Sequence, residues 1–305
     1  MKATVLLNAS AGWMAGANGA ATLKRVREAF ASVNVAAQVL ALDHAGLAEA
    51  AVRAASSDVD AVVLGGGDGT VNTGAAAIAG SPKALGILPL GTLNHFAKDA
   101  GIPLDFDEAV ATIAAGVVRE VDVGEVNGRV FINNSSVGLY PSAVDQRDEL
   151  RHQHGGGKTS AMLNASADVF RRFPLLDVTL QVNDRAVALR TPFVFVGNNR
   201  YDMSLFSLGR RTTLDGGELG VYLTRTTNRF GVLRLACRAL IGRMKQDRDF
   251  RYFTIREIEI RSRRRSLRVA LDGEVVQMTS PIRYSIRPRA LRVLAPPPEP
   301  PPEDA

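Results

Sequence analysis

Glycines and one carboxylate stand together at residues 65–72, which read Gly-Gly-Gly-Asp-Gly-Thr-Val-Asn. An apolar run precedes this segment, and a helix-like stretch begins at Thr73. Glycine lets the backbone approach an anion closely, and a helix N-terminus directs free N–H groups and a partial positive charge at it. Asp68 could hold Mg²⁺ beside the phosphates. The segment predicts a phosphate cradle and nucleotide chemistry, although glycine turns after strands are also common as purely structural turns.

The elements before residue 124 predict an α/β domain. Strands are expected at residues 4–7, 35–42, 60–64 and 84–88, with helices at 20–31 and 47–55. This alternation is typical of an open, largely parallel sheet covered by helices. Ligands of such sheets bind at the C-terminal ends of the strands, so the loops after Leu7, Leu64 and Leu88 should share one site.

The pattern after residue 124 predicts a mostly antiparallel β-sandwich. Short β-rich runs occur at residues 130–133, 177–182, 186–190, 193–196, 220–224, 255–261, 267–271 and 282–286. A hairpin turn is expected at Asn183-Asp184, and helices are expected at 160–172 and 229–245. The last eleven residues hold six prolines and three acids and should be disordered. The predicted domains are 1–124 and 125–294, with a last strand that could return to the first domain, followed by a tail at 295–305.

Composition restricts the environment. The chain has 305 residues, 46% of them hydrophobic, and one cysteine, Cys237, which excludes an internal disulfide and fits a reducing compartment. The apolar run at residues 3–7 is too short for a signal peptide, and no stretch has the length of a membrane span. These features predict a cytoplasmic protein.

Further motifs follow in order along the chain. Residues 8–12 resemble N-P-x-[SA]-G, with Ala9 replacing proline, and residues 89–97 resemble P-x-G-T-x-N-D-F-A, with His95 replacing aspartate. Matches to D-x-G and F-x-N (122–124, 131–133), D-G-x-L (215–219), D-G-E (272–274) and a closing segment (290–294) follow. With GGDGT-x-N, these motifs resemble the diacylglycerol kinase and sphingosine kinase superfamily, which also includes NAD kinases and 6-phosphofructokinases. The resemblance covers nearly the whole chain, and its details are similar to those of bacterial lipid kinases.

The resemblance implies a site for ATP and Mg²⁺. The residues that it assigns to nucleotide are Asn8, Ser10, Gly12, Gly66, Gly67, Asp68, Gly69, Thr70, Asn72, Thr92 and Asn94. Asp215 resembles a carboxylate that holds a structural Mg²⁺, with the carbonyls of Thr212 and Gly217 completing that site.

The resemblance also implies that Asp272 or Glu274 removes the proton from the acceptor hydroxyl as general base. Asp272 is slightly favoured. On a regular strand the two side chains face the same side, whereas a turn could separate them. A D-G-E string by itself is usually only a hairpin turn.

The whole chain has a net charge of +6. Its basic residues cluster in the second half of the sequence. Arginines cluster at 261, 263, 264, 265 and 268. Such a cluster favours anions, including phospholipid headgroups, but it is also typical of a solvated strand edge. A basic amphipathic helix at 229–245 could lie in a bilayer interface or pack on the β-domain. We expect a lipid substrate at an anionic membrane surface with peripheral contact and no nucleic acid; a homodimer is left open.

The leading interpretation is an ATP-dependent lipid kinase that phosphorylates a hydroxyl of diacylglycerol, a sphingoid base, ceramide or a related lipid. One alternative is an NAD kinase, although that family's later N-x-G-x-x-G-F-L string is missing. The other is a non-catalytic lipid- or nucleotide-binding regulator, against which the presence of Asp68, Asp272 and Glu274 argues.

Overall fold

The structure is a computed structural model that describes residues 1–10, 18–138, 175–182, 185–202, 210–211, 213–224, 230–231, 234 and 250–297. Several predictions lie outside these residues: Gly12, Thr212, Cys237, the turn at Asn183-Asp184, the helix at 160–172, most of the helix at 229–245 and the tail beyond residue 297.

The chain forms two compact units. The first comprises residues 1–123 together with the chain from residue 287 onward, and the second comprises residues 124–286. Two strands, β5 (Val118–Val126) and β18 (Ile282–Leu294), contribute to both units, because each division falls within one of them.

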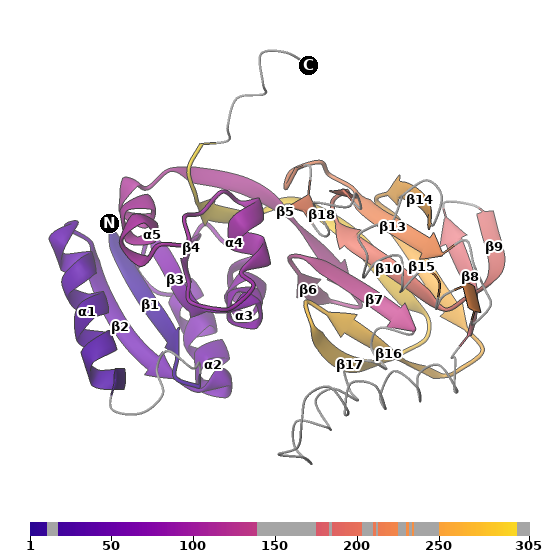
Figure 1. Ribbon diagram of the computed structural model, residues 1–305, viewed down its shortest axis with the longest axis horizontal. Helices are drawn as coiled ribbons and strands as arrows, with labels where there is room; N and C mark the ends of the chain where they lie inside the picture. Colours follow the sequence, from indigo (N-terminus) through magenta and orange to yellow (C-terminus); the bar gives the residue numbers. More distant parts are fainter. Residues whose placement is uncertain are drawn as a thin grey trace. The chain divides into compact units, whose positions relative to one another are not determined.

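Parallel strands covered by helices make up the first unit (Figure 1). The strand order is β2-β1-β3-β4, with every neighbouring pair parallel, and the C-terminal part of β18 pairs with β4, also in parallel. The elements are β1 (Lys2–Asn8), α1 (Asn18–Ser32), β2 (Ala36–Leu42), α2 (His44–Ala55), β3 (Ala61–Gly66), α3 (Asp68–Ile78), β4 (Ala84–Pro89), α4 (His95–Asp99) and α5 (Phe106–Ala115). The predicted parallel α/β fold is confirmed.

Burial of its strands explains why this sheet could be predicted from the sequence. Strands β3 and β4 are buried along their whole length, and a parallel strand covered on both faces reads as a continuous apolar run. On one face, Val5 and Val63 pack in a cluster with Phe30 of α1 and Ile113 of α5. Helices α2 and α3 contact one another and pack on β1 and β3.

One local prediction for this unit was wrong, and two helices were not predicted. The helix after the glycine turn begins at Asp68, not at Thr73, because Gly67 takes the N-cap position with an extended backbone. Helices α4 and α5 were not predicted. Helix α5 has a conventional start, since the carboxylate of Asp105 accepts the N–H groups of Asp107 and Glu108.

Antiparallel strands make up the second unit. One sheet has the order β14-β13-β10-β7-β16-β17, and the N-terminal part of β18 continues through β15 and β8 to β9 in another. The strands are β6 (Arg129–Phe131), β7 (Asn134–Gly138), β8 (Leu176–Val182), β9 (Arg185–Thr191), β10 (Phe193–Asn198), β11 (Tyr201–Asp202), β12 (Arg210–Arg211), β13 (Leu219–Thr224), β14 (Phe250–Ile255), β15 (Glu257–Ser262), β16 (Ser266–Leu271) and β17 (Glu274–Thr279). The predicted antiparallel sandwich is confirmed.

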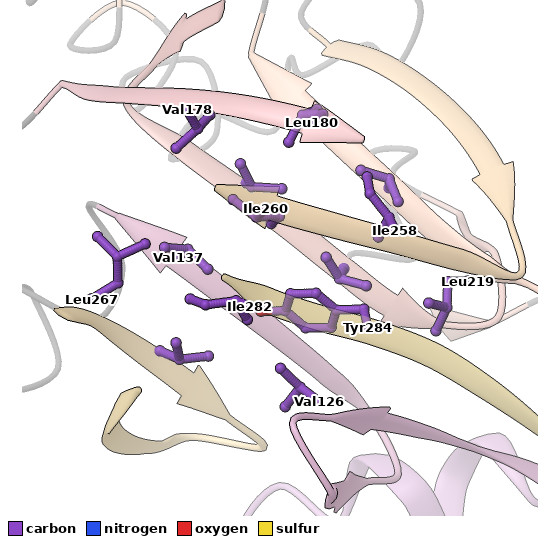
Figure 2. Close-up of a cluster of buried hydrophobic side chains, with 14 of the residues drawn as sticks. Val126, Val137, Val178, Leu180, Leu219, Ile258, Ile260, Leu267, Ile282 and Tyr284 are labelled. Carbon is purple, nitrogen blue, oxygen red and sulfur yellow. The ribbon is translucent and has the colours of Figure 1, made fainter. Parts of the chain in front are cut away.

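The sandwich core lies between these sheets. Figure 2 shows Val178, Leu180 and Ile258 from one sheet with Val137 and Leu219 from the other, and all of them are buried. Two runs were divided differently in the sequence analysis. Arg256 separates β14 from β15 where one strand was predicted, and the run at 130–133 ends as a strand at Phe131. Residues 132–133 instead form a connection that belongs to the candidate site.

Among the described residues, none of the helices combines the length and the hydropathy of a membrane-spanning segment.

Candidate functional site

Three loops meet at one edge of the parallel sheet in the first unit. The register pairs Leu7 with Gly65 and Gly66 with Pro89, so strands β1, β3 and β4 end side by side. The amide nitrogen of Asn8 donates to the hydroxyl of Thr70 over 3.1 Å, which joins the first loop to helix α3. Ser10 is exposed, and its N–H donates to the Asn8 side-chain oxygen.

The loops after β3 and β4 touch through glycine backbones. A Cβ atom added to Gly91 would lie 2.3 Å from the Cα of Gly67 and 2.7 Å from Oδ1 of Asn94. Both distances are far shorter than an ordinary contact, so a side chain at position 91 would push the two loops apart. Glycine at position 91 therefore allows these two backbone segments to lie in direct contact.

Asp68 belongs to the first turn of α3, where its carboxylate is half-buried. Its Oδ1 accepts the N–H of Phe96 over 3.2 Å, in the first turn of α4, where backbone donors have no acceptor within the helix itself. Its second oxygen has no partner among the described residues, so Asp68 combines a structural contact with one oxygen that a ligand could use.

The side chain of Asn94 makes its hydrogen bonds within its own loop. The residue has a left-handed backbone with φ of 50° and is buried. Its amide donates to the carbonyls of Pro89 and Gly91, and its Oδ1 accepts the N–H of Gly91. With these three bonds it shapes the loop, while Thr92 two residues earlier is exposed.

Asn72 follows Asp68 by one helical turn on α3. Its Oδ1 is buried and has no hydrogen-bond partner among the described residues. A buried acceptor without a partner destabilises a fold by about 1–3 kcal/mol, so this atom is a place where a donor from a ligand or water would be stabilising.

In the second unit, Asp272 and Gly273 form the two-residue turn between β16 and β17. Their φ values are 47° and 92°, and Leu271 pairs directly with Glu274 across the turn. This turn leaves Glu274 exposed and directs the Asp272 carboxylate inward. The two candidate bases are therefore separated, as a turn would predict and a regular strand would not.

Backbone donors surround the Asp272 carboxylate. Oδ2 accepts the N–H of Ile132 at 2.8 Å, and Oδ1 accepts those of Asn133 and Asn134, both at 2.9 Å. Burial raises the pKa of Asp272 to about 6, while the three hydrogen bonds and the charge of Arg211 act in the opposite direction. A carboxyl group with this pKa can exchange a proton close to neutral pH.

Two residues that the sequence analysis missed hold the donors in place. Arg211 and Asn198 both donate to the carbonyl of Ile132, and Arg211 also donates to the side chain of Asn133. The F-x-N motif marked this segment, but no signal in the sequence pointed to either partner.

The candidate metal residues lie in the loop before β13. Asp215 is exposed and its Oδ1 accepts the hydroxyl of Thr213, Gly217 has a left-handed backbone with φ of 70°, and Thr212 lies outside the described residues. The neighbouring Asn199 is fully buried, its Oδ1 has no partner among the described residues, and a Cβ on Gly216 would lie 2.8 Å from that atom. Carboxylate and amide oxygens suit Mg²⁺, although in the described part of the chain no three acidic, histidine or cysteine side chains are grouped so that they could hold a metal ion.

The arginine cluster lies along β15, β16 and the turn that joins them. Arg261 and Arg283 both pair with Glu259, whose side chain is 14% exposed. Arg263, Arg264 and Arg265 form the exposed turn and have no carboxylate partner within the described residues.

Comparisons with known proteins agree over both units. The model of the diacylglycerol kinase catalytic domain matches residues 2–126, and that of the YegS C-terminal NAD kinase beta sandwich-like domain matches residues 142–295. Among curated relatives, a diacylglycerol kinase of Bacillus subtilis is 27% identical over 230 residues, which cover 74% of each chain. A probable lipid kinase YegS-like of Citrobacter koseri is 38% identical over 104 residues, 32% of this chain, and the match spans 35% of that protein.

Solved structures support the fold. A diacylglycerol kinase structure from Bacillus anthracis str. Sterne has a TM-score of 0.69 at 19% identity and covers 97% of both chains. A second structure from the same organism has a TM-score of 0.74 at 21% identity and covers 97% of this chain and 98% of its own. At such identity the likeness establishes the architecture.

Proposed function

The chain belongs to the family of diacylglycerol kinases and YegS-like lipid kinases. From this premise we propose that it transfers the γ-phosphoryl group of ATP to the hydroxyl of a lipid. The acceptor is diacylglycerol, a sphingoid base, ceramide or a related lipid. The observation that carries the proposal is the convergence of three glycine- and amide-containing loops at the C-terminal edge of the parallel sheet.

The nucleotide site uses those loops. Phosphoryl transfer depends mostly on positioning and charge stabilisation, which backbone N–H groups and hydroxyls can supply. Thr92 and Ser10 are exposed and available to phosphate oxygens, whereas Asn94 and Asn8 hold the loops that present them. The unpartnered Oδ1 of Asn72 fits a donor supplied within the same site.

Asp272 is the favoured general base. A carboxylate offers about four acceptor positions, and Oδ1 already uses two and Oδ2 one. About one position therefore remains, on Oδ2, where the proton of the acceptor hydroxyl can be received. With that proton received by Asp272, the hydroxyl oxygen would form its bond to the γ-phosphorus of bound ATP while the bond from that phosphorus to the bridging oxygen breaks and ADP leaves. Glu274, exposed on the same turn, is the alternative base or an orienting partner.

Mg²⁺ has two candidate positions. Asp68, with one oxygen available, fits a cation beside the phosphates, directly or through water. Asp215 is the candidate for a structural cation, and the carbonyls of Gly217 and of Thr212, which lies outside the described residues, would complete that site. Bound Mg²⁺ would neutralise phosphate charge at the first position.

The lipid reaches the enzyme at an anionic bilayer surface. Arg263, Arg264 and Arg265 are exposed without acidic partners in the described part of the chain, so their charge is available to phospholipid headgroups. Each such basic group contributes about 1 kcal/mol near an anionic leaflet.

Purified protein tests the function directly. Radiolabelled ATP and Mg²⁺ are incubated with a panel of diacylglycerol, sphingosine and ceramide in mixed micelles, and with NAD in parallel. We expect label in one lipid class and none in NAD, and loss of the signal in Asp68→Asn. Labelled NAD would make the protein an NAD kinase, and ATP binding without any labelled product would make it a regulator.

A further inference from the structure

A buried polar network is linked to Asp272 through the connection between β6 and β7. The carbonyl of Ile132 accepts a hydrogen bond from Nδ2 of Asn198 at 2.9 Å and another from Nη1 of Arg211. Nη2 of Arg211 donates to Oδ1 of Asn133 at 3.1 Å. Asn198 is fully buried, and Asn133 and Arg211 are buried to more than nine-tenths.

This network acts on Asp272 through one peptide group. The peptide that joins Ile132 to Asn133 accepts from Arg211 and Asn198 at its oxygen and donates to Asp272 at its N–H. A cation at the carbonyl end polarises the peptide and strengthens the bond made by its N–H, because hydrogen bonds in a chain reinforce one another in a low-dielectric interior.

The same contacts fix the donors in space. Three consecutive N–H groups converge on one carboxylate, and the backbone N–H of Asp272 in turn donates to the carbonyl of Asn134 at 2.9 Å. Such convergence requires a defined backbone for residues 131–134. Arg211 and Asn198 hold that backbone from β12 and β10, which are far from it in sequence.

We propose that Arg211 and Asn198 are positioning residues for Asp272, which hold the connection between β6 and β7 and set the proton affinity of the carboxylate through the Ile132–Asn133 peptide. The part that concerns catalysis rests on the proposed function. The part that concerns the proton affinity of Asp272 does not.

Arg211 of β12 is the one charged group in the described part of the chain that shifts the pKa of Asp272. The connection after β6, the start of β7 and the end of β10 contribute the uncharged Asn133, Asn134 and Asn198. Glu274 follows on the same turn and is exposed. Loss of Arg211 should therefore leave burial unopposed by any facing cation.

The test measures the titration of Asp272 without using activity. Carboxyl ¹³C resonances of Asp-labelled protein are followed between pH 4 and 9, and the Asp272 signal is identified by its loss in Asp272→Asn. In Arg211→Met we expect its pKa to rise by about one unit or more, the usual influence of a close opposite charge. In Arg211→Lys it should stay near the wild-type value. Arg200→Met is the matched control, because Arg200 lies over the Tyr252 ring in the same unit.

Asn198→Ala keeps the charge and removes one donor to Ile132, and we expect a smaller rise in the same direction. It also carries the test if Arg211→Met does not fold. An unchanged Asp272 titration in Asn198→Ala, and in Arg211→Met where that variant folds, would overturn the proposal and leave Arg211 as a packing residue.

Kinetics then separates this inference from the proposed function. The acidic limb of the pH–kcat profile should move to higher pH in Arg211→Met by the amount that NMR measures, with little change in KM for ATP. If NMR shows the shift but kcat does not follow it, Asp272 is not the base and only the proposed mechanism fails. If kcat falls without any shift in either profile, the positioning role through proton affinity is wrong.

Discussion

Replacing Gly91 with alanine tests the geometry of the nucleotide loops. The added Cβ would lie 2.3 Å from the Cα of Gly67. Ordinary carbon contacts lie at about 3.5–4.0 Å, so the two loops must separate by more than about 1 Å. The same atom would come 2.7 Å from Oδ1 of Asn94, which fastens the loop. The backbone of both loops must therefore move.

Two consequences can be measured. Overpacking of this kind typically destabilises by about 1–3 kcal/mol, and each kcal/mol lowers Tm by about 2–4 °C in a protein unit of roughly 150–250 residues. A displacement of about 1 Å in groups that position a reacting phosphate can lower turnover by about 10²-fold. We expect a Tm lower by several degrees, a raised KM for ATP and a lower kcat in Gly91→Ala.

Gly67→Ala is the matched control, because the contact is not symmetric. A Cβ on Gly67 would meet only the Cα of Gly91, at 3.5 Å, and Gly67 has an ordinary φ of −90°. This variant should lower Tm less than Gly91→Ala does, because it makes no close contact and loses only the preference for glycine over alanine at an N-cap. Any loss of ATP affinity would then report crowding of the anion itself. A Gly91→Ala protein with wild-type Tm and wild-type KM for ATP would refute the close approach of the two loops.

Three further predictions concern charged side chains. Asp68→Asn should lower turnover by at least about 10²-fold, which is the scale of one lost electrostatic contributor. The variant should keep its fold, because asparagine can still accept the Phe96 N–H. A near-normal kcat in the purified variant would remove Asp68 from the mechanism. Asp272 has a pKa of about 6 against an ordinary 3.8, so the folded state holds more protons than the unfolded state between these values. In denaturation experiments, the free energy of unfolding of the wild type should fall from pH 4 to pH 6, and that of Asp272→Asn should fall less. The same variant should bind ATP but fail to transfer the phosphoryl group. An equal pH dependence of unfolding in the two proteins would contradict the burial of an ionisable carboxyl group. Replacing Arg263, Arg264 and Arg265 with serine should weaken sedimentation with phosphatidylglycerol vesicles by roughly 100-fold at low salt, at about 1 kcal/mol per group, while sparing activity on a short-chain soluble lipid. Serine at Lys24, Arg53 and Arg185 is the control, and equal vesicle binding by both triple variants would return the cluster to a solvated strand edge.

The strands of the α/β unit could be predicted from the sequence because each one depends on residue types in a short, continuous segment. Strands β1, β3 and β4 are buried on both faces, so each appears as an apolar run, and the loops at their ends follow from the topology of parallel sheets. The start of α3 was misplaced because residues 68–72 are rich in turn formers, and Gly67 as N-cap lacks the side chain that usually marks a helix start. Helices α4 and α5 are short and were overlooked.

Sequence alone thus determined the two architectures, the order of the motifs and the family, since each depends on residue types at fixed local spacing. Tertiary structure decided how those residues are used. Asp68 caps a helix 28 residues away, and Asp272 receives its donors from residues about 140 positions away. Arg211 meets Ile132 across 79 residues. Such contacts depend on which strands pair and in which register, so whether Asp272 or Glu274 is enclosed could be settled only by the turn between β16 and β17 and the backbone packed against it.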